Sequence, residues 1–274
     1  MFAEGNESRK GVLVLIGGDE DKSGERIILR RLVEINQAKR IAIIPTASAH
    51  PRKLAEQYLN AFKAVGVAAT ESVDIRNQRD ASAAHYLEII ARSDLIFFTG
   101  GDQVKLVETL DDTPILKLIR EQFAKGTTIA GTSAGAAAAG DPMLFDGDER
   151  GFQKGTVNVD RGFGLLSGVV VDTHFVRRRR ISRLAQVLAQ GCATLGIGLA
   201  EDTGIVIAPD HTFEVIGSGM VTVLDSRELA YSDYHEVAEE QQITIDGLRL
   251  SFLAAGATFS LTKRAVIPSS IRIE

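Results

Sequence analysis

A serine between glycines is the strongest chemical signal in the chain. Residues 131–135 read Gly-Thr-Ser-Ala-Gly, after a strand-like stretch and before an alanine-rich one. In a nucleophile elbow such glycines allow a sharp turn from strand to helix, and the serine hydroxyl stands beside the helix N-terminus. We therefore predict that Ser133 is a nucleophile. The alternative is a turn of small residues at which a helix packs closely on a strand, so the serine needs partners elsewhere.

A serine nucleophile needs a general base and a group that orients this base. His174 lies three positions after the end of the valine run 169–171, and strand ends are where parallel sheets place their sites. The other histidines lie where structural roles suffice: His50, His85, His211 and His235. Glu201, after the glycine-rich stretch 196–200, is the predicted orienting acid, and its neighbour Asp202 is the alternative.

The oxyanion of acyl transfer needs preorganised N–H donors. Gly100 and Gly101 follow the apolar run 95–98, and without a Cβ their N–H groups can face a reacting carbonyl. We predict that one of them, with the Ala134 N–H, forms the oxyanion hole. A Gly-Gly turn alone is weak evidence, because the similar Gly17-Gly18 also follows a strand-like run.

Five arginines fall within seven positions, at 177–180 and 183. Such a run is usually a solvated helix face. At about 100° per residue, however, a helix here would place Arg180 within its apolar arc and Arg183 at the edge of that arc. The apolar arc consists of Val176, Ile181, Leu184, Val187 and Leu188. We expect the two arginines to need acceptors, which a carboxylate-bearing substrate could supply.

Short apolar runs alternate with segments of helical period through the first half of the chain, as parallel strands joined by helices do. The predicted strands are 12–16, 40–44, 68–75, 94–98 and 127–130, and the predicted helices are 25–35, 52–65, 82–91, 104–110 and 114–124. Beyond residue 196 shorter strands follow, with a turn at Asp246-Gly247, which we assign as antiparallel additions to the same sheet. The prediction is a single α/β domain over 1–274, a three-layer sandwich with a mostly parallel central sheet and helices on both faces. Residues 146–160 are the predicted mobile loop.

Composition excludes several classes of protein. With 45% hydrophobic and 24% charged residues the chain is globular, and its net charge of −5 gives no reason to expect a nucleic-acid partner. Cys192 is the single cysteine, which rules out an intrachain disulfide or a multi-thiolate zinc site. Residues 1–10 are polar, a predicted flexible tail without an export signal, and no membrane span is visible. We expect a cytoplasmic protein that needs no metal or cofactor.

Taken together, the motifs resemble the cyanophycinases. The resemblance rests on Gly-Gly-Asp-Glu-Asp-Lys at 17–22, Thr-Gly-Gly-Asp-Gln at 99–103, Gly-Thr-Ser-Ala-Gly at 131–135, Asp-Thr-His-Phe at 172–175 and Gly-Ile-Gly-Leu-Ala-Glu-Asp at 196–202. The motifs follow one another in the same order as in that family, and the resemblance covers about residues 11–264. The resemblance implies a serine peptidase related to aspartyl dipeptidases, with an α/β sandwich that usually forms a homodimer. Its substrate would be cyanophycin, a poly-aspartate that carries arginine on each side-chain carboxyl, and its product the dipeptide β-Asp-Arg.

The resemblance also implies roles for residues. Ser133 would be the nucleophile, His174 the base and Glu201 the orienting acid. The implied substrate pocket consists of Gln103, Asp172, Thr173, Arg178, Arg180 and Arg183. Thr173 stands where the family has glutamine, which leaves the substrate open. The alternatives are a dipeptidase for Asp-X or isoaspartyl peptides and, in another class, a non-catalytic domain that binds carboxylate or phosphate.

Overall fold

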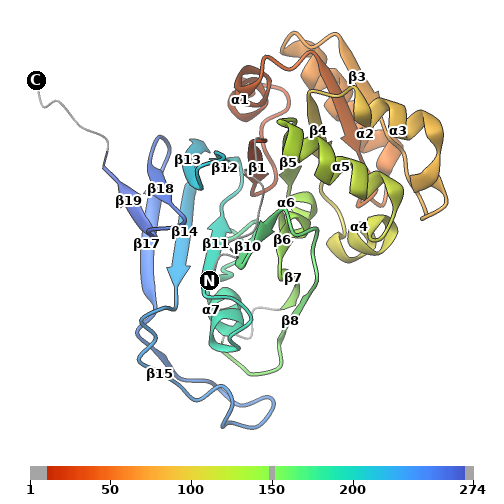
Figure 1. Ribbon diagram of the computed structural model, residues 1–274. Helices are drawn as coiled ribbons and strands as arrows, with labels where there is room; N and C mark the ends of the chain where they lie inside the picture. The colour runs from red at the N-terminus through yellow and green to blue at the C-terminus, as the bar shows by residue number, and fades with distance from the viewer. Residues whose placement is uncertain (1–10, 148–151, 269–274) are drawn as a thin grey trace, which may run out of the picture.

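The computed structural model describes residues 11–147 and 152–268 (Figure 1). Within them, the larger sheet has nine strands in the order β19-β18-β13-β12-β1-β5-β4-β2-β3. Its parallel half consists of β1 (Leu13–Ile16), β2 (Arg40–Ile44), β3 (Ala69–Ser72), β4 (Leu95–Phe98) and β5 (Thr128–Thr132). Antiparallel strands extend it beyond β1: β12 (Thr203–Ile207), β13 (Thr212–Gly217), β18 (Thr258–Ser260) and β19 (Ala265–Ile267).

Helices cover both faces of the parallel half, which confirms the predicted α/β class. Alternate residues of β1 belong to two separate cores, Val14 and Ile16 to one and Leu13 and Leu15 to the other. The first core includes α1 (Ile27–Ile35) and α2 (Pro51–Ala64). The second core includes α3 (Ala84–Ala91), α4 (Gln103–Leu110), α5 (Pro114–Lys125) and α6 (Ala134–Ala139). Because helices cover both faces of the sheet, the side chains on both sides of strands such as β1 and β4 are apolar, and polar residues do not alternate with apolar ones.

A second sheet corrects the prediction that all later strands extend the first one. It has the order β10-β11-β14-β17, with β10 (Val169–Asp172), β11 (Leu195–Leu199), β14 (Met220–Asp225) and β17 (Arg249–Ala254). Helix α7 (Ile181–Ala189) packs on this sheet, because Leu184, Val187 and Leu188 share a core with Val170 and Leu224. The turn after β11 therefore carries the chain from the second sheet into β12 of the first.

The prediction of a mobile loop at 146–160 is wrong at both ends, where the chain forms strands. Strands β7 (Met143–Gly147) and β8 (Val157–Asp160) pair antiparallel, because Leu144 and Val157 are buried in the core beneath α7. Residues 148–151, like the predicted tail 1–10, lie outside the described residues. The shorter elements are β6 (Gly140–Asp141), β9 (Leu166–Ser167), β15 (Tyr231–Ser232), β16 (Ile245–Asp246) and a 3₁₀ turn (Asp80–Ser82). The expected turn after Asp246 is present, with Gly247 at a φ of 88°. Among the described residues, no helix is both long enough and apolar enough to cross a membrane.

Candidate active site

Ser133 stands in the sharp turn between β5 and α6. Its backbone has φ 51° and ψ −113°, a left-handed conformation that few non-glycine residues adopt. Glycine is required on both sides of it: a Cβ on Gly131 would lie 2.4 Å from the Gly135 carbonyl oxygen, and one on Gly135 would lie 2.6 Å from the Phe98 carbonyl oxygen. The turn therefore has the strand–serine–helix geometry of a nucleophile elbow.

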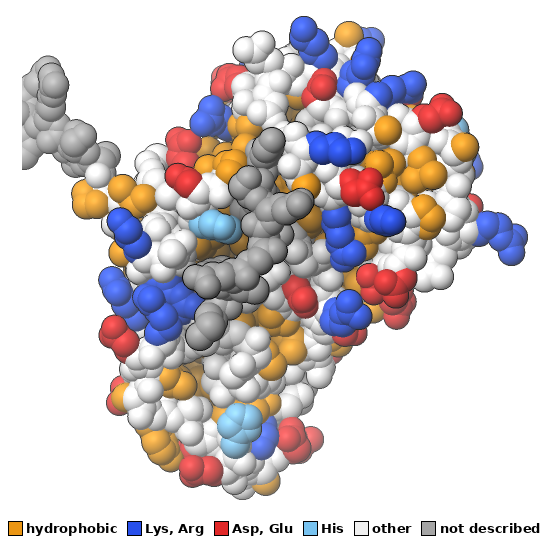
Figure 2. All heavy atoms as spheres, viewed as in Figure 1, with side chains coloured by type: hydrophobic (Ala, Val, Ile, Leu, Met, Phe, Trp, Pro, Cys, Tyr) orange, Lys and Arg blue, Asp and Glu red, His pale blue; other side chains and the backbone are white. Residues whose placement is uncertain are grey.

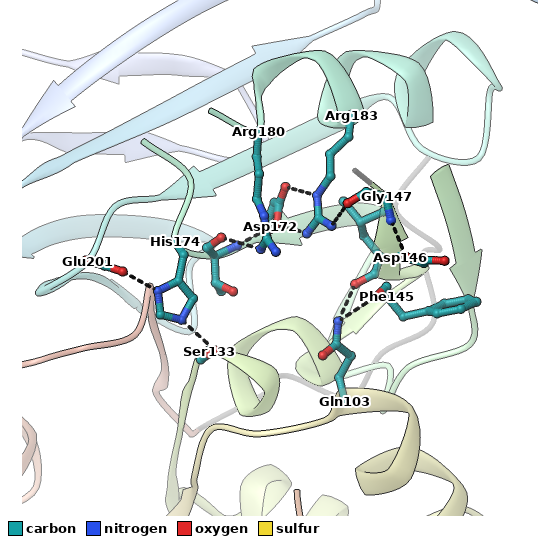
Figure 3. Close-up of polar contacts among 12 residues, drawn as sticks. Gln103, Ser133, Phe145, Asp146, Gly147, Asp172, His174, Arg180, Arg183 and Glu201 are labelled. Carbon is teal, nitrogen blue, oxygen red and sulfur yellow. Dashed lines mark hydrogen bonds and ion pairs between the residues drawn. The ribbon is translucent and has the colours of Figure 1, made fainter. Parts of the chain in front are cut away.

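His174 and Glu201 complete a line of hydrogen bonds from Ser133 (Figure 3). The Ser133 Oγ lies 3.0 Å from His174 Nε2, and His174 Nδ1 lies 2.6 Å from Glu201 Oε1. Ser133 follows β5 of the large sheet, whereas His174 and Glu201 follow β10 and β11 of the second sheet. With Nδ1 protonated toward Glu201, Nε2 is free to accept the serine proton. The arrangement is that of a general base poised on a nucleophile.

The two candidate acids at the end of β11 have different partners. Burial opposes ionisation of Glu201, but hydrogen bonds from His174 and from Arg177, the latter at 2.9 Å, bring its pKa below the ordinary value of 4.5. The Asp202 carboxylate instead accepts the Asp21 N–H at 3.1 Å and the Ser218 hydroxyl at 2.6 Å. Of the two acids, Glu201 is therefore the one that contacts the imidazole.

The loop after β1, which sequence reasoning treated as an unspecific turn, holds all three site segments together. Three successive carbonyls, that of the last residue of β1 and those of the first two loop residues, accept backbone N–H groups: Ile16 from Ser133 at 2.9 Å, Gly17 from His174 at 2.8 Å and Gly18 from Asp202 at 2.9 Å. A Cβ on Gly18 would lie 2.5 Å from the His174 ring, so the imidazole rests on this glycine. The signal that could have revealed the loop is the repeated Gly-Gly-Asp at 17–19 and 100–102, after the two strands that flank β5.

The predicted oxyanion donors lie beside Ser133. An ideal Cβ on Gly100 would approach the Ser133 Cβ to 3.3 Å, whereas one on Gly101 would meet the Ala47 carbonyl oxygen at 2.1 Å. Gly100 is thus the glycine that faces the serine, and Gly101 permits close packing against a neighbouring loop. Ala134 is the first residue of α6, where helix N–H groups have no partner within the helix.

Asp172, at the end of β10, gathers two of the arginines. Only 1% of this residue is exposed, and its carboxylate receives Arg183 Nε at 2.8 Å, Arg183 Nη2 at 2.5 Å and Arg180 Nη1 at 3.2 Å (Figure 3). The acceptor that we expected from a substrate is therefore supplied to Arg183 by the protein itself. The predicted apolar arc is wrong at its start, because Val176 and Ile181 are 60% and 41% exposed: residues 175–180 form turns, and α7 begins only at Ile181.

The other residues predicted to line the substrate pocket have different hydrogen-bond partners within the protein. Arg180 donates from Nη1 to the Thr173 carbonyl at 2.7 Å; burial lowers its pKa to about 10, so it keeps its charge at neutral pH. Arg178 is exposed and forms no ion pair with a described residue. Gln103, the first residue of α4, donates from Nε2 to the carbonyls of Leu144 at 3.2 Å and Phe145 at 3.3 Å. Thr173, between Asp172 and His174, is buried.

Replacing Asp172 by asparagine is expected to lower the free energy of unfolding by about 3–5 kcal/mol, because the change leaves the Arg183 charge buried without its carboxylate. Urea unfolding, followed by circular dichroism, measures the change. Asp160→Asn is the matched control, since the Asp160 side chain is exposed at the end of β8 and accepts the N–H of its neighbour, Arg161. Equal stability of the two variants would contradict the argument.

Comparison with known proteins supports one family. The model of peptidase family S51 matches residues 13–216, a span that includes the three hydrogen-bonded residues. A cyanophycinase from Trichormus variabilis is 36% identical over 271 residues, which cover 97% of this chain and 91% of that protein. A cyanophycinase from Geminocystis herdmanii is 36% identical over 256 residues, which cover 92% of this chain and 94% of that protein.

Solved structures share the fold at lower identity. A peptidase from an acI-B1 Actinobacterium superposes with a TM-score of 0.68 at 22% identity, over 93% of this chain and 98% of that one. A putative peptidase E protein from Listeria monocytogenes gives 0.54 at 18% identity, over 76% of this chain and 99% of that one. The family match and the relatives together lead to one conclusion: the chain belongs to peptidase family S51 and is a serine peptidase similar to cyanophycinases.

Proposed function

We propose that the protein hydrolyses cyanophycin and releases β-Asp-Arg dipeptides from its end, with Ser133, His174 and Glu201 as the catalytic triad. The observation that carries the proposal is the hydrogen-bonded line of these three residues, next to the arginines that Asp172 gathers, in a chain 36% identical to a cyanophycinase over nearly its whole length. The resemblance also supports a homodimer as the working assembly, and the single cysteine is compatible with the cytoplasm.

The geometry supports an acyl-enzyme mechanism. His174 Nε2 takes the proton of the Ser133 hydroxyl as Oγ attacks the scissile carbonyl carbon, and the carbonyl electrons move onto oxygen. The Ala134 N–H and a glycine N–H, for which the position of Gly100 is the better fit, stabilise this oxyanion. The imidazolium, stabilised by Glu201, then protonates the leaving amine. Water, deprotonated by His174, then attacks the acyl-enzyme; the acyl–Oγ bond breaks, His174 returns the proton to Ser133 Oγ, and the product leaves with a free carboxyl group.

The charges around the serine suit a substrate with both signs in each repeat. Arg180 would meet a substrate carboxylate, as the resemblance also implies for Arg178, whereas Asp172 acts through the guanidinium groups that it holds, because its oxygens are already occupied. Gln103 turns its amide oxygen away from Leu144 and Phe145, leaving it as an acceptor for a substrate guanidinium (Figure 3). Figure 2 shows that basic and acidic side chains are interspersed over one face of the molecule.

A dipeptidase for Asp-X or isoaspartyl peptides is the second candidate, and Thr173 is the observation that favours it. A threonine cannot reach as far as the glutamine that the family has there, so a hydrogen bond to the polymer would be absent.

The test is a substrate panel. Purified wild-type protein is incubated with cyanophycin, with Asp-X dipeptides and with β-Asp-X dipeptides, and products are identified by mass spectrometry, with Ser133→Ala protein as the blank. We expect β-Asp-Arg from the polymer. Hydrolysis of the dipeptides alone, with the polymer left intact, would establish the second candidate instead.

A further inference from the structure

A buried carboxylate in the loop after β1 lies outside the proposed reaction. Glu20 is 2% exposed, and its oxygens are held by residues from two other elements. Oε2 accepts the Thr132 hydroxyl at 2.6 Å, and Oε1 accepts the Tyr58 hydroxyl. Lys22 Nζ lies 3.4 Å from Oε1 and also donates to the Glu20 backbone carbonyl at 3.0 Å. A buried acidic group is retained in a fold only where such partners compensate its desolvation.

The donors of this cluster are fixed in their roles. Burial, followed by the negative charge of Glu20, raises the pKa of Tyr58 well above its ordinary value, so the hydroxyl remains a donor. Lys22 Nζ also lies over the Tyr58 ring, 5.0 Å from its centroid, which adds a cation–π contact to the cluster. Glu20 thus joins the loop after β1 to α2 and to the end of β5.

The position of this junction connects it to the nucleophile. Thr132 is the last residue of β5 and immediately precedes Ser133, whose left-handed backbone is strained. Glu20 belongs to the same loop whose carbonyls hold Ser133 and His174 and on whose Gly18 the imidazole rests. The Thr132–Glu20 hydrogen bond therefore links the residue before Ser133 to the same loop that holds the backbone of His174.

We propose that Glu20 is a positioning residue: through Thr132 it holds the Ser133 elbow at its separation from His174. The proposal rests on the serine mechanism given above. Geometry of this kind has large kinetic effects, since a misplacement of about 1 Å can reduce a rate by roughly 10²-fold. The motif Asp-Glu-Asp-Lys at 19–22 thereby has a role beyond that of a turn.

The test replaces the donor rather than the buried acid. Thr132→Val keeps the side-chain shape and leaves Glu20 Oε2 without its partner, whereas Thr132→Ser retains the hydroxyl. Thr46→Val is the matched control: Thr46 is fully buried, and its hydroxyl bonds the Ile75 carbonyl at 3.0 Å near the end of β2, two strands away from β5. The readouts are kcat and KM on cyanophycin and the second-order rate at which a fluorophosphonate labels Ser133.

We expect Thr132→Val to lower both kcat and the labelling rate by about tenfold with KM unchanged, Thr132→Ser to restore both, and Thr46→Val to lower the melting temperature without slowing either. Glu20→Ala, which removes both acceptor oxygens, should slow labelling as well, and Thr132→Val should add no further loss in that background. Labelling at the wild-type rate in folded Thr132→Val protein, or an equal loss in Thr46→Val, would overturn the proposal.

The labelling readout separates this inference from the proposed substrate. If the wild-type protein is labelled at Ser133 but leaves cyanophycin intact, the substrate proposal fails, and the variants still decide the role of Glu20. If the wild-type protein is not labelled at Ser133, the serine mechanism is wrong and the role of Glu20 falls with it.

Discussion

Replacing Ser133 by alanine is expected to slow hydrolysis by roughly 10⁴- to 10⁶-fold, because the change removes the oxygen that attacks the scissile carbonyl. The substrate pocket and the predicted oxyanion donors remain, so residual catalysis above the rate in water is expected, together with an almost unchanged KM. Single-turnover measurement of product release, with enzyme in excess over substrate, can follow a rate this low.

The control for this variant is Ser226→Ala. The Ser226 hydroxyl lies 3.4 Å from the Thr194 carbonyl, beside the end of β14, and has no contact with the triad. It should keep wild-type activity. Near-normal activity of Ser133→Ala protein would rule out Ser133 as the nucleophile, and fluorophosphonate labelling of another residue would then locate the true one.

The parallel half of the fold could be predicted from local sequence because its physical cause is local. The run Leu95-Ile96-Phe97-Phe98 is buried throughout, as a strand covered on both faces must be. The strands predicted at 12–16, 40–44 and 94–98 differ from β1, β2 and β4 by one residue at most. Helical periodicity located α2 and α5 equally well, since each has one apolar face toward the sheet.

The second sheet could not be predicted in this way. Strands β13 and β14 have similar short apolar patterns, yet β13 pairs with β12 in one sheet and β14 with β11 in the other. Strand pairing depends on contacts between segments that are distant in sequence, and the sequence of one strand does not determine which strand pairs with it. The start of α7 was misplaced for a related reason, because periodicity alone cannot distinguish a chain of turns from a helix.

The site shows the same division between local and distant causes. Ser133 and His174 were predicted from their places at strand ends, and the structure puts their side chains in hydrogen-bond contact. The pairing of Asp172 with Arg183 and the role of the loop at Gly17-Gly18 arise only when two sheets meet. Arg180 and Arg183 were expected to need acceptors, but the sequence could not show that the protein supplies one itself in Asp172.

Replacing Glu201 by glutamine is the prediction with the second largest effect, a loss of roughly 10²- to 10⁴-fold in kcat. In the wild-type protein the carboxylate accepts the Nδ1 proton of His174 and leaves Nε2 unprotonated for the serine. A glutamine can present its N–H₂ to Nδ1 instead, which places the ring proton on Nε2 and removes the base. Asp202→Asn is the matched control, because an asparagine can still accept the Asp21 N–H and meet the Ser218 hydroxyl.

Measuring kcat against pH for the wild-type, Glu201→Gln and Asp202→Asn proteins compares the two acids a second time. Because hydrogen bonds from His174 and Arg177 hold the pKa of Glu201 below its ordinary value of 4.5 against the effect of burial, this carboxylate is mostly charged at pH 5 and above, and its protonation adds no large activity loss between pH 8 and 5. Between pH 8 and 5 the loss in Glu201→Gln protein should therefore reflect the missing carboxylate, and not protonation of that carboxylate in the wild-type protein. Asp202→Asn should keep activity within about threefold of the wild type, since its hydrogen bonds survive. A larger loss in Asp202→Asn than in Glu201→Gln would transfer the orienting role to Asp202, even though Glu201 is the acid that lies 2.6 Å from the imidazole.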